Sequence, residues 1–116
     1  MVGELSKYQK ATGVTTNDSR WLKFNHNLGV TPKIVIITNE NEHDATSTLL
    51  KYFILSKEIG ASETYTGAAN GYNVYTEVTT LGNGRACLLD SDIEVRQAAS
   101  NRNFSINDSY TIELYA

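Results

Sequence analysis

Residues 109–116, SYTIELYA, alternate apolar and polar side chains without a break. Tyr110, Ile112 and Leu114 fall on one face of an extended chain, and Thr111 and Glu113 fall on the other. Alternation with a period of two residues is typical of an antiparallel strand with one buried face and one solvated face. The stretch therefore predicts a half-buried β-strand.

The same period recurs in three other segments, DIEVRQ (92–97), RWLKFNH (20–26) and GYNVYTEVTTL (71–81). In the last of these, the predicted buried face carries Tyr72, Val74, Thr76 and Val78. Tyr, Thr, Val and Ile are all enriched in strands, so composition and periodicity favour the same structure.

Polar turns separate these segments. Asn83-Gly84 tolerates the positive φ of a tight turn, so residues 80–86 are predicted to form a hairpin. Further turns are expected at residues 90–92 and 106–109, where Asp, Asn and Ser cluster. Together these patterns predict an all-β fold, a single antiparallel β-sandwich domain over residues 1–116, with residues 1–19 as a first strand plus a loop.

Residues 47–60, STLLKYFILSKEIG, fit two structures. A helix would begin with a cap at residue 47 or 48 and end at Gly60. A strand would place Leu50, Tyr52 and Ile54 on one face. The β-branched and aromatic residues favour the strand, and the helix stays open as the alternative.

Composition limits the function. The chain has 116 residues, of which 41% are apolar and 20% charged, which suits one folded domain. Its net charge is −3 and its pI about 5.3, so we expect no nucleic-acid partner. Residues 1–20 contain no apolar run, so we expect no secretion signal and no membrane insertion.

The phrase FNHNLGVTPKIVIITNE, residues 24–40, raises the question of an active-site histidine. Gly29 can adopt a positive φ, and Pro32 restricts the chain just before the next strand. His26 continues the apolar face of the strand before the turn, which favours a core-rim histidine bonded to that turn. Residues 34–37 are apolar on both faces and predict a strand covered on both sides, inside the sandwich or at a subunit interface.

Signals of catalysis are weak. Glu40, Glu42, His43 and Asp44 could hold a cation, but adjacent loop residues seldom converge, so a solvated acidic loop is favoured. A carboxylate pair at residues 90 and 92 is more typical of a turn, and the lone Cys87 of a small core residue. No phosphate-binding loop or nucleophile elbow occurs in the sequence. We expect no enzyme, no cofactor and no metal.

Exposed aromatic residues are the remaining signal. We expect a ligand-binding set of Tyr65, Tyr75, Trp21 and Asn70, because aromatic rings stack on sugars and Asn binds hydroxyl groups. Residues 59–71 are predicted to form the longest loop and to present Tyr65. Burial of these aromatic residues in an oligomer interface is the equal alternative.

The motif aromatic-x-His-x-Leu-Gly-x-x-Pro at residues 24–32, followed by a β-branched strand, resembles small β-sandwich modules at the receptor-binding ends of phage tail fibres. It is more loosely similar to H-type lectin domains. NGYNVYTEV (70–78) and DSYTIELYA (108–116) stand where those families have a Gly-aromatic strand and an aromatic-rich closing strand. The closing strand here lacks the tryptophan, and residues 47–70 match nothing in either family.

The resemblance implies a trimeric or larger homo-oligomer in a phage or prophage tail, located in the virion with other virion proteins as neighbours. It implies a non-catalytic module that binds a cell-surface saccharide or another host receptor, and it identifies no binding residue in this chain. The alternative is a purely structural virion protein, a tail or capsid decoration whose surfaces serve assembly.

Overall fold

The computed structural model describes residues 6–43, 49–58, 60–65, 68–97 and 104–116, with the backbone alone for residues 60–65 and 68–72. These residues form strands, turns and connecting segments, and none of them is helical. The strands are β1 (Tyr8–Val14), β2 (Trp21–Asn25), β3 (Ile34–Asn39), β4 (Tyr52–Ser56), β5 (Gly60–Tyr65), β6 (Ala68–Tyr75), β7 (Arg85–Leu88), β8 (Asp92–Arg96) and β9 (Tyr110–Tyr115).

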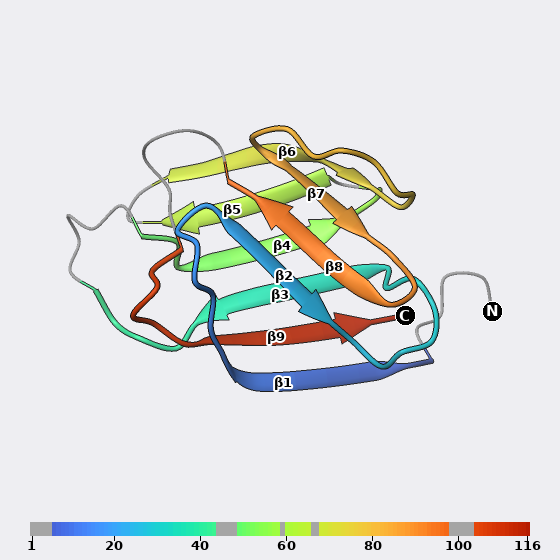
Figure 1. Cartoon of the computed structure of the whole chain (residues 1–116), viewed down its shortest axis with the longest axis horizontal. Helices are drawn as coiled ribbons and strands as arrows, with labels where there is room; N and C mark the ends of the chain where they lie inside the picture. Colours follow the sequence, from blue (N-terminus) through green and yellow to red (C-terminus); the bar gives the residue numbers. More distant parts are fainter. Residues whose placement is uncertain (1–5, 44–48, 59, 66–67, 98–103) are drawn as a thin grey trace.

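The strands form two layers packed face to face (Figure 1). Hydrogen bonding follows the order β1-β9-β3-β4-β5-β6-β7-β8-β2. β6 belongs to both layers, because residues 68–72 pair with β5 and residues 73–75 pair with β7. We name the layer of β1, β9, β3, β4 and β5 sheet A, and the layer of β7, β8 and β2 sheet B. The predicted all-β sandwich is confirmed.

The core lies between the inward faces of the two sheets. Sheet A contributes Val35, Ile37, Phe53, Leu55, Ile112 and Leu114, and sheet B contributes Leu22, Ala86, Leu88, Ile93 and Val95. Each of these side chains is at most 1% exposed. Burial of one Val, Leu, Ile or Phe side chain stabilises a fold by about 1.5–3 kcal/mol. The period-two patterns of residues 20–26, 92–97 and 109–116 therefore assigned the buried faces correctly.

Residues 52–56 are strand β4 and not part of a helix. Phe53 and Leu55 are its buried residues, whereas Tyr52 and Ile54 are half-buried on the outer face of sheet A. Pairing with β3 on one side and β5 on the other completes the backbone hydrogen bonds of this central strand. The strand interpretation was correct.

The predicted hairpin at residues 80–86 is wrong. Gly84 has the expected positive φ of 73°, but β6 and β7, the strands on either side, are parallel neighbours. The segment between them therefore crosses over instead of turning back. β6 also ends at Tyr75, so Val78, assigned to a buried face, is 86% exposed.

The predicted long loop at residues 59–71 is also wrong. Residues 60–65 form β5 and residues 68–75 form β6, paired from Ala61–Tyr72 to Tyr65–Ala68. Small residues have weak strand propensity, but backbone pairing with β4 supplies the order that the side chains do not signal. Tyr65 is the last residue of a strand, and its side chain lies outside the described residues, as does that of Asn70.

His26 occupies the core rim, as predicted. Its side chain is 5% exposed, its Nε2 lies 2.8 Å from the carbonyl oxygen of Leu89, and its Nδ1 accepts the amide of Leu28 at 3.2 Å. These partners require the neutral Nε2–H tautomer. Gly29 follows with a φ of 75° and completes the turn into β3. This histidine connects the turn before β3 to the turn between β7 and β8.

Residues 34–37 are covered unequally. Val35 and Ile37 are fully buried between the sheets, whereas Ile34 and Ile36 are half-buried on the outer face of sheet A. Within one chain, therefore, only the inner face of this strand is fully covered.

Candidate functional site

Residues 15–20, which connect β1 to β2, form a loop held by its own side chains. The Thr16 hydroxyl donates to the carbonyl oxygen of Trp21 at 2.8 Å and accepts the amide of Asp18 at 3.2 Å. The Asp18 carboxylate in turn accepts the amide of Arg20 at 2.8 Å. Such local bonds order a turn before any ligand binds.

Trp21 begins the edge strand β2 and points away from the core, because its neighbour Leu22 points inward. Its side chain is 39% exposed, an unusual exposure for a large aromatic ring. The guanidinium of Arg96, directly across on β8, lies 4.7 Å from the ring centroid. This cation–π contact holds the indole in one orientation.

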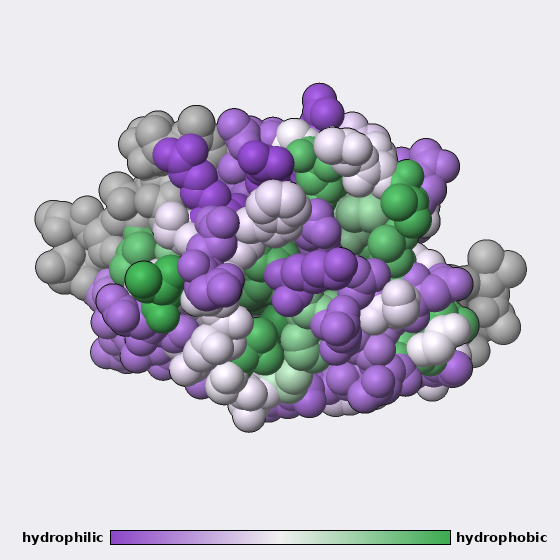
Figure 2. Space-filling model, in the orientation of Figure 1, coloured by the Kyte–Doolittle hydropathy of each residue, from purple (hydrophilic) through white to green (hydrophobic). Residues whose placement is uncertain are grey.

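An open hollow of about 650 Å³ lies beside the ring, between residues 15–18 and the side chains of Trp21, Lys23 and Glu94. Among the described residues, the side chains of Thr15, Asn17 and Glu94 make no hydrogen bond. On this side of the molecule hydrophilic residues lie among smaller hydrophobic areas (Figure 2). The hollow thus combines one exposed aromatic ring with a hydroxyl, an amide and a carboxylate that are available to a ligand.

The strand register explains how this set comes together. Lys23 lies across from Glu94, and Trp21 lies across from Arg96, in the antiparallel pair of β2 and β8. The Lys23 ammonium also lies 3.4 Å from the carboxylate of Asp92. Period two places these polar residues on an outer face, but the sequence contains no signal that β2 pairs with β8. Sequence reasoning therefore missed Lys23, Glu94 and Arg96.

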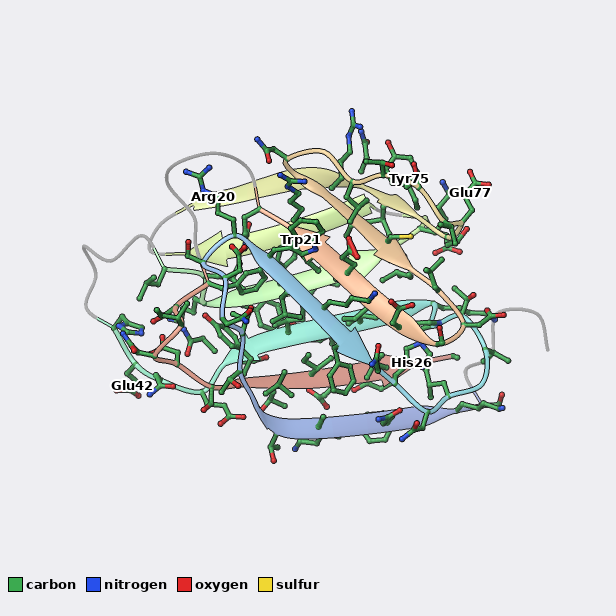
Figure 3. The ribbon with its side chains drawn as sticks, viewed as in Figure 1. Arg20, Trp21, His26, Glu42, Tyr75 and Glu77 are labelled. Carbon is green, nitrogen blue, oxygen red and sulfur yellow. The ribbon has the colours of Figure 1, made fainter. Side chains whose placement is uncertain are left out.

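Of the four predicted ligand-binding residues, only Trp21 lies at the hollow. Tyr75 is half-buried on β6, with the Lys57 ammonium 5.9 Å from its ring centroid. It shares the outer face of sheet B but is three strands from Lys23, roughly 14 Å. Figure 3 shows Trp21 and Tyr75 apart on this face. The structure does not bring these two aromatic residues into one site.

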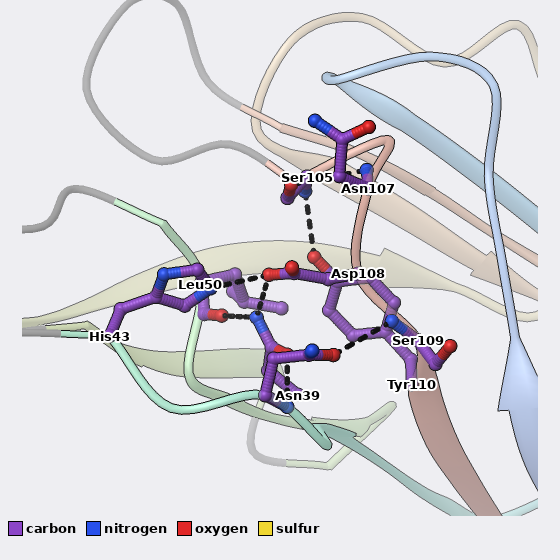
Figure 4. A network of polar contacts seen from close by, with 9 residues as sticks. Asn39, His43, Leu50, Ser105, Asn107, Asp108, Ser109 and Tyr110 are labelled. Atoms are coloured by element: carbon purple, nitrogen blue, oxygen red, sulfur yellow. Dashed lines mark hydrogen bonds and ion pairs between the residues drawn. The ribbon is translucent and has the colours of Figure 1, made fainter.

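The segment after β3 is more ordered than the predicted solvated acidic loop. The Glu40 carboxylate accepts the amide of Gly13 at 2.8 Å and the hydroxyl of Thr111 at 2.9 Å. His43 Nε2 lies 2.5 Å from the Asp108 carboxylate (Figure 4). Asp44 lies outside the described residues.

Asp108 is the centre of that network. Its side chain is only 6% exposed, and the same oxygen that faces His43 accepts the Asn39 amide at 2.9 Å. No group of three or more His, Cys, Asp or Glu side chains converges as a metal site within the part of the chain that the structure describes. Hydrogen bonds of this network join the segment after β3 to the turn before β9.

The remaining candidate groups have structural partners. Asp90 accepts a hydrogen bond from the Thr31 hydroxyl, and Asp92 binds Lys23. Cys87 is 4% exposed, and burial, with a smaller contribution from Glu94, raises the pKa of its thiol. A buried thiol with a raised pKa is a poor nucleophile at neutral pH.

No protein-family model, curated protein or solved structure compared with this chain matches it. The similarity to phage tail-fibre modules thus stays a hypothesis based on residues 24–32, 70–78 and 108–116. Among the residues described, no helix is long and apolar enough to cross a membrane.

Proposed function

We propose that this protein is a non-catalytic carbohydrate-binding module of a phage or prophage tail, and that it binds a cell-surface saccharide in the hollow beside Trp21. The observation that carries the proposal is the exposed, oriented indole next to three polar side chains, Thr15, Asn17 and Glu94, that make no hydrogen bond among the described residues. Sugar rings present apolar C–H faces to aromatic rings and hydroxyl groups to amides and carboxylates. The tail-fibre resemblance supports the virion setting.

Rigidity supports binding as well. The loop of residues 15–20 is fixed by internal hydrogen bonds, and Trp21 is held by Arg96. A site that is ordered before binding loses less conformational entropy when the ligand arrives. Weak single-site affinity is usual for such open sites, and presentation in several copies would raise it by avidity.

Multiple copies are part of the proposal, with a homotrimer as the expected form. The outer face of sheet A carries half-buried apolar side chains, among them Ile34, Ile36 and Ile54. Its central carboxylate, Glu113, already accepts hydroxyls from Tyr8 at 2.9 Å and Tyr115 at 3.3 Å. Covering this face would therefore bury apolar area without leaving that carboxylate unpaired.

The same face favours the second candidate function, a purely structural virion protein. In that case assembly through sheet A would be the whole role, and no saccharide would bind. The two functions are distinguishable because Trp21 lies on the outer face of sheet B, on the other side of the sandwich from Ile36.

The test for binding is an array of cell-surface saccharides probed with the purified protein and with Trp21→Ala. Loss of an aromatic anchor should weaken binding by about 1–3 kcal/mol, roughly 5- to 150-fold, with the fold intact. Ile106→Ala is the matched control, since Ile106 is 57% exposed in another turn. Retention of full affinity by Trp21→Ala, or no bound glycan, would contradict the proposal.

The test for assembly is the mass in solution by light scattering. We expect a trimer, and we expect Ile54→Glu to dissociate it, because Ile54 lies on the outer face of sheet A across from Ile36, and a carboxylate there would be buried in the interface without a partner. Val30→Glu, at a site 40% exposed in a loop, should leave the mass unchanged. A monomer at micromolar concentration would refute the oligomer proposal and leave the saccharide proposal standing.

A further inference from the structure

Two arginines face each other on the outer surface of sheet B. Arg85 on β7 and Arg96 on β8 are direct cross-strand partners, and Arg96 is the partner of Trp21 on β2. The inner faces of these strands are fixed by Ala86 and Val95, both fully buried, so both arginines point outward. Like charges directly opposite in a sheet destabilise it.

Both guanidiniums lie against the same turn. Arg96 donates from Nη1 to the carbonyl oxygen of Leu81 at 3.1 Å, and a Cβ placed on Gly82 would lie 3.5 Å from Nη1 of Arg85. At that distance the Arg85 guanidinium is in ordinary van der Waals contact with the position of Gly82. The two cationic groups therefore meet at the turn of Leu81 and Gly82, and Arg96 also lies over the Trp21 ring.

Neither arginine has an acidic partner among the described residues. Arg85 makes no side-chain hydrogen bond or ion pair there, and Arg96 makes only the bond to Leu81 and the contact with Trp21. The nearest acidic side chain on this face in the strand register is Glu94, two residues before Arg96. Each guanidinium has five donor hydrogens, so most of them are available to a ligand.

We propose that Arg85 and Arg96 together bind an oxyanion group of the saccharide whose ring lies on Trp21, so that the ligand is an acidic saccharide carrying a carboxylate, sulfate or phosphate. This inference rests on the proposed function and narrows its ligand. Arginine pairs bind such groups through charge-assisted, often bidentate hydrogen bonds. The ligand anion also removes the repulsion between the two arginines.

The geometry suits one ligand. Trp21, Arg96 and Arg85 occupy adjacent positions on three neighbouring strands, a span of roughly 10 Å. The ring of a sugar on Trp21 thus lies next to the guanidinium that binds its anionic substituent. Glu94 and Asn17, on the other side of the ring, remain for hydroxyl groups, because neutral hydroxyls donate to a carboxylate as well as to an amide oxygen.

The experiment uses an array of immobilised saccharides in which each acidic glycan is paired with its neutral counterpart, a methyl ester or a desulfated form. We expect retention of acidic members only, with binding that weakens as sodium chloride rises. Arg85→Gln should weaken it at least tenfold. Since Arg85 has no partner in the described structure, this variant should fold with an unchanged or higher melting temperature.

Lys51→Gln is the charge-matched control, because Lys51 is exposed just before β4 of sheet A and its side chain has no partner among the described residues, so its removal should not alter binding. The protein could instead bind each acidic glycan and its neutral counterpart equally, and lose both in Trp21→Ala. That result would overturn the anion site and leave the saccharide-binding function standing. Binding of acidic glycans with the same affinity by Arg85→Gln would also overturn the anion site, because the attraction would then come from the overall charge distribution and not from this arginine pair. No bound glycan at all would overturn both proposals.

Discussion

Replacement of His26 tests how the two turns at one end of the sandwich are joined. His26→Ala removes the side chain that contacts the Leu89 carbonyl at 2.8 Å and accepts the Leu28 amide at 3.2 Å. Leu28 is 6% exposed, so its amide would lose its partner in a place that water hardly reaches. The backbone bond from the His26 amide to the Ser91 carbonyl, 3.0 Å, would remain.

The expected loss follows from two terms. An unsatisfied buried polar group costs about 1–3 kcal/mol, and loss of a buried ring adds a cavity term of about 1 kcal/mol after partial collapse. We therefore expect His26→Ala to lower the free energy of unfolding by about 2–4 kcal/mol. His26→Asn should lose about half as much, because its side-chain oxygen can still accept the amide of Leu28.

The assay is equilibrium urea unfolding at neutral pH, followed by the fluorescence of Trp21, the single tryptophan of the chain. Val30→Ala is the control, since Val30 is 40% exposed in the same turn and its truncation should cost less than about 0.5 kcal/mol. A change below 0.5 kcal/mol for His26→Ala would refute the view that this histidine joins the turns.

Two further predictions concern titratable groups. Burial raises the pKa of Tyr110 to about 12, so the folded state favours the neutral phenol. The resulting contribution to the free energy of unfolding is complete below the unfolded pKa of about 10 and is lost as pH rises through about 12. Tyr110→Phe should be less stable at neutral pH, because the amide of Ser105 loses its acceptor at 2.8 Å. In an alkaline titration followed by circular dichroism, the same variant should unfold at a higher pH than the parent, because it has no phenol to ionise. An unchanged alkaline midpoint would contradict the role of the phenol. Cys87 should react with iodoacetamide far more slowly in the native protein than in urea, because burial raises the pKa of its thiol, and equal rates in a mass-spectrometric time course would show that the thiol is accessible.

Sequence patterns predicted the strands that bury one face and leave the other in solvent. In β8 and β9 every second residue is fully buried, so a period of two identifies the inner face without knowledge of any partner strand. The pattern failed in β5 and in the first residues of β6, where Gly60, Ala61 and Ala68 carry little hydrophobic signal. β5 forms because its backbone completes the hydrogen bonds of β4, and the first residues of β6 pair in turn with β5, a cause that no local window of sequence contains.

Some features of the candidate site could also be predicted from local sequence patterns, whereas others depend on strand pairing. The sequence alone identifies Trp21 as an outward aromatic residue, because Leu22 and Phe24 define the inner face of its strand. Arg85, Lys23 and Glu94 could be assigned to outer faces by the same rule. Lys23 and Glu94 line the hollow and Arg85 lies across from Arg96 only because of which strands pair, and propensity and periodicity do not encode that pairing.

What the sequence by itself determined, then, is the all-β class, the inner faces of β2, β8 and β9, and the turns at Gly29 and residues 90–92. Only the tertiary structure decided that β6 passes from one sheet to the other, that β6 and β7 are parallel, and that β7, β8 and β2 are neighbours. The physical reason is that burial of a face is a local property of alternating side chains, whereas strand order is selected by the packing and hydrogen bonding of the whole chain. That order is what places Arg85, Arg96 and Trp21 side by side.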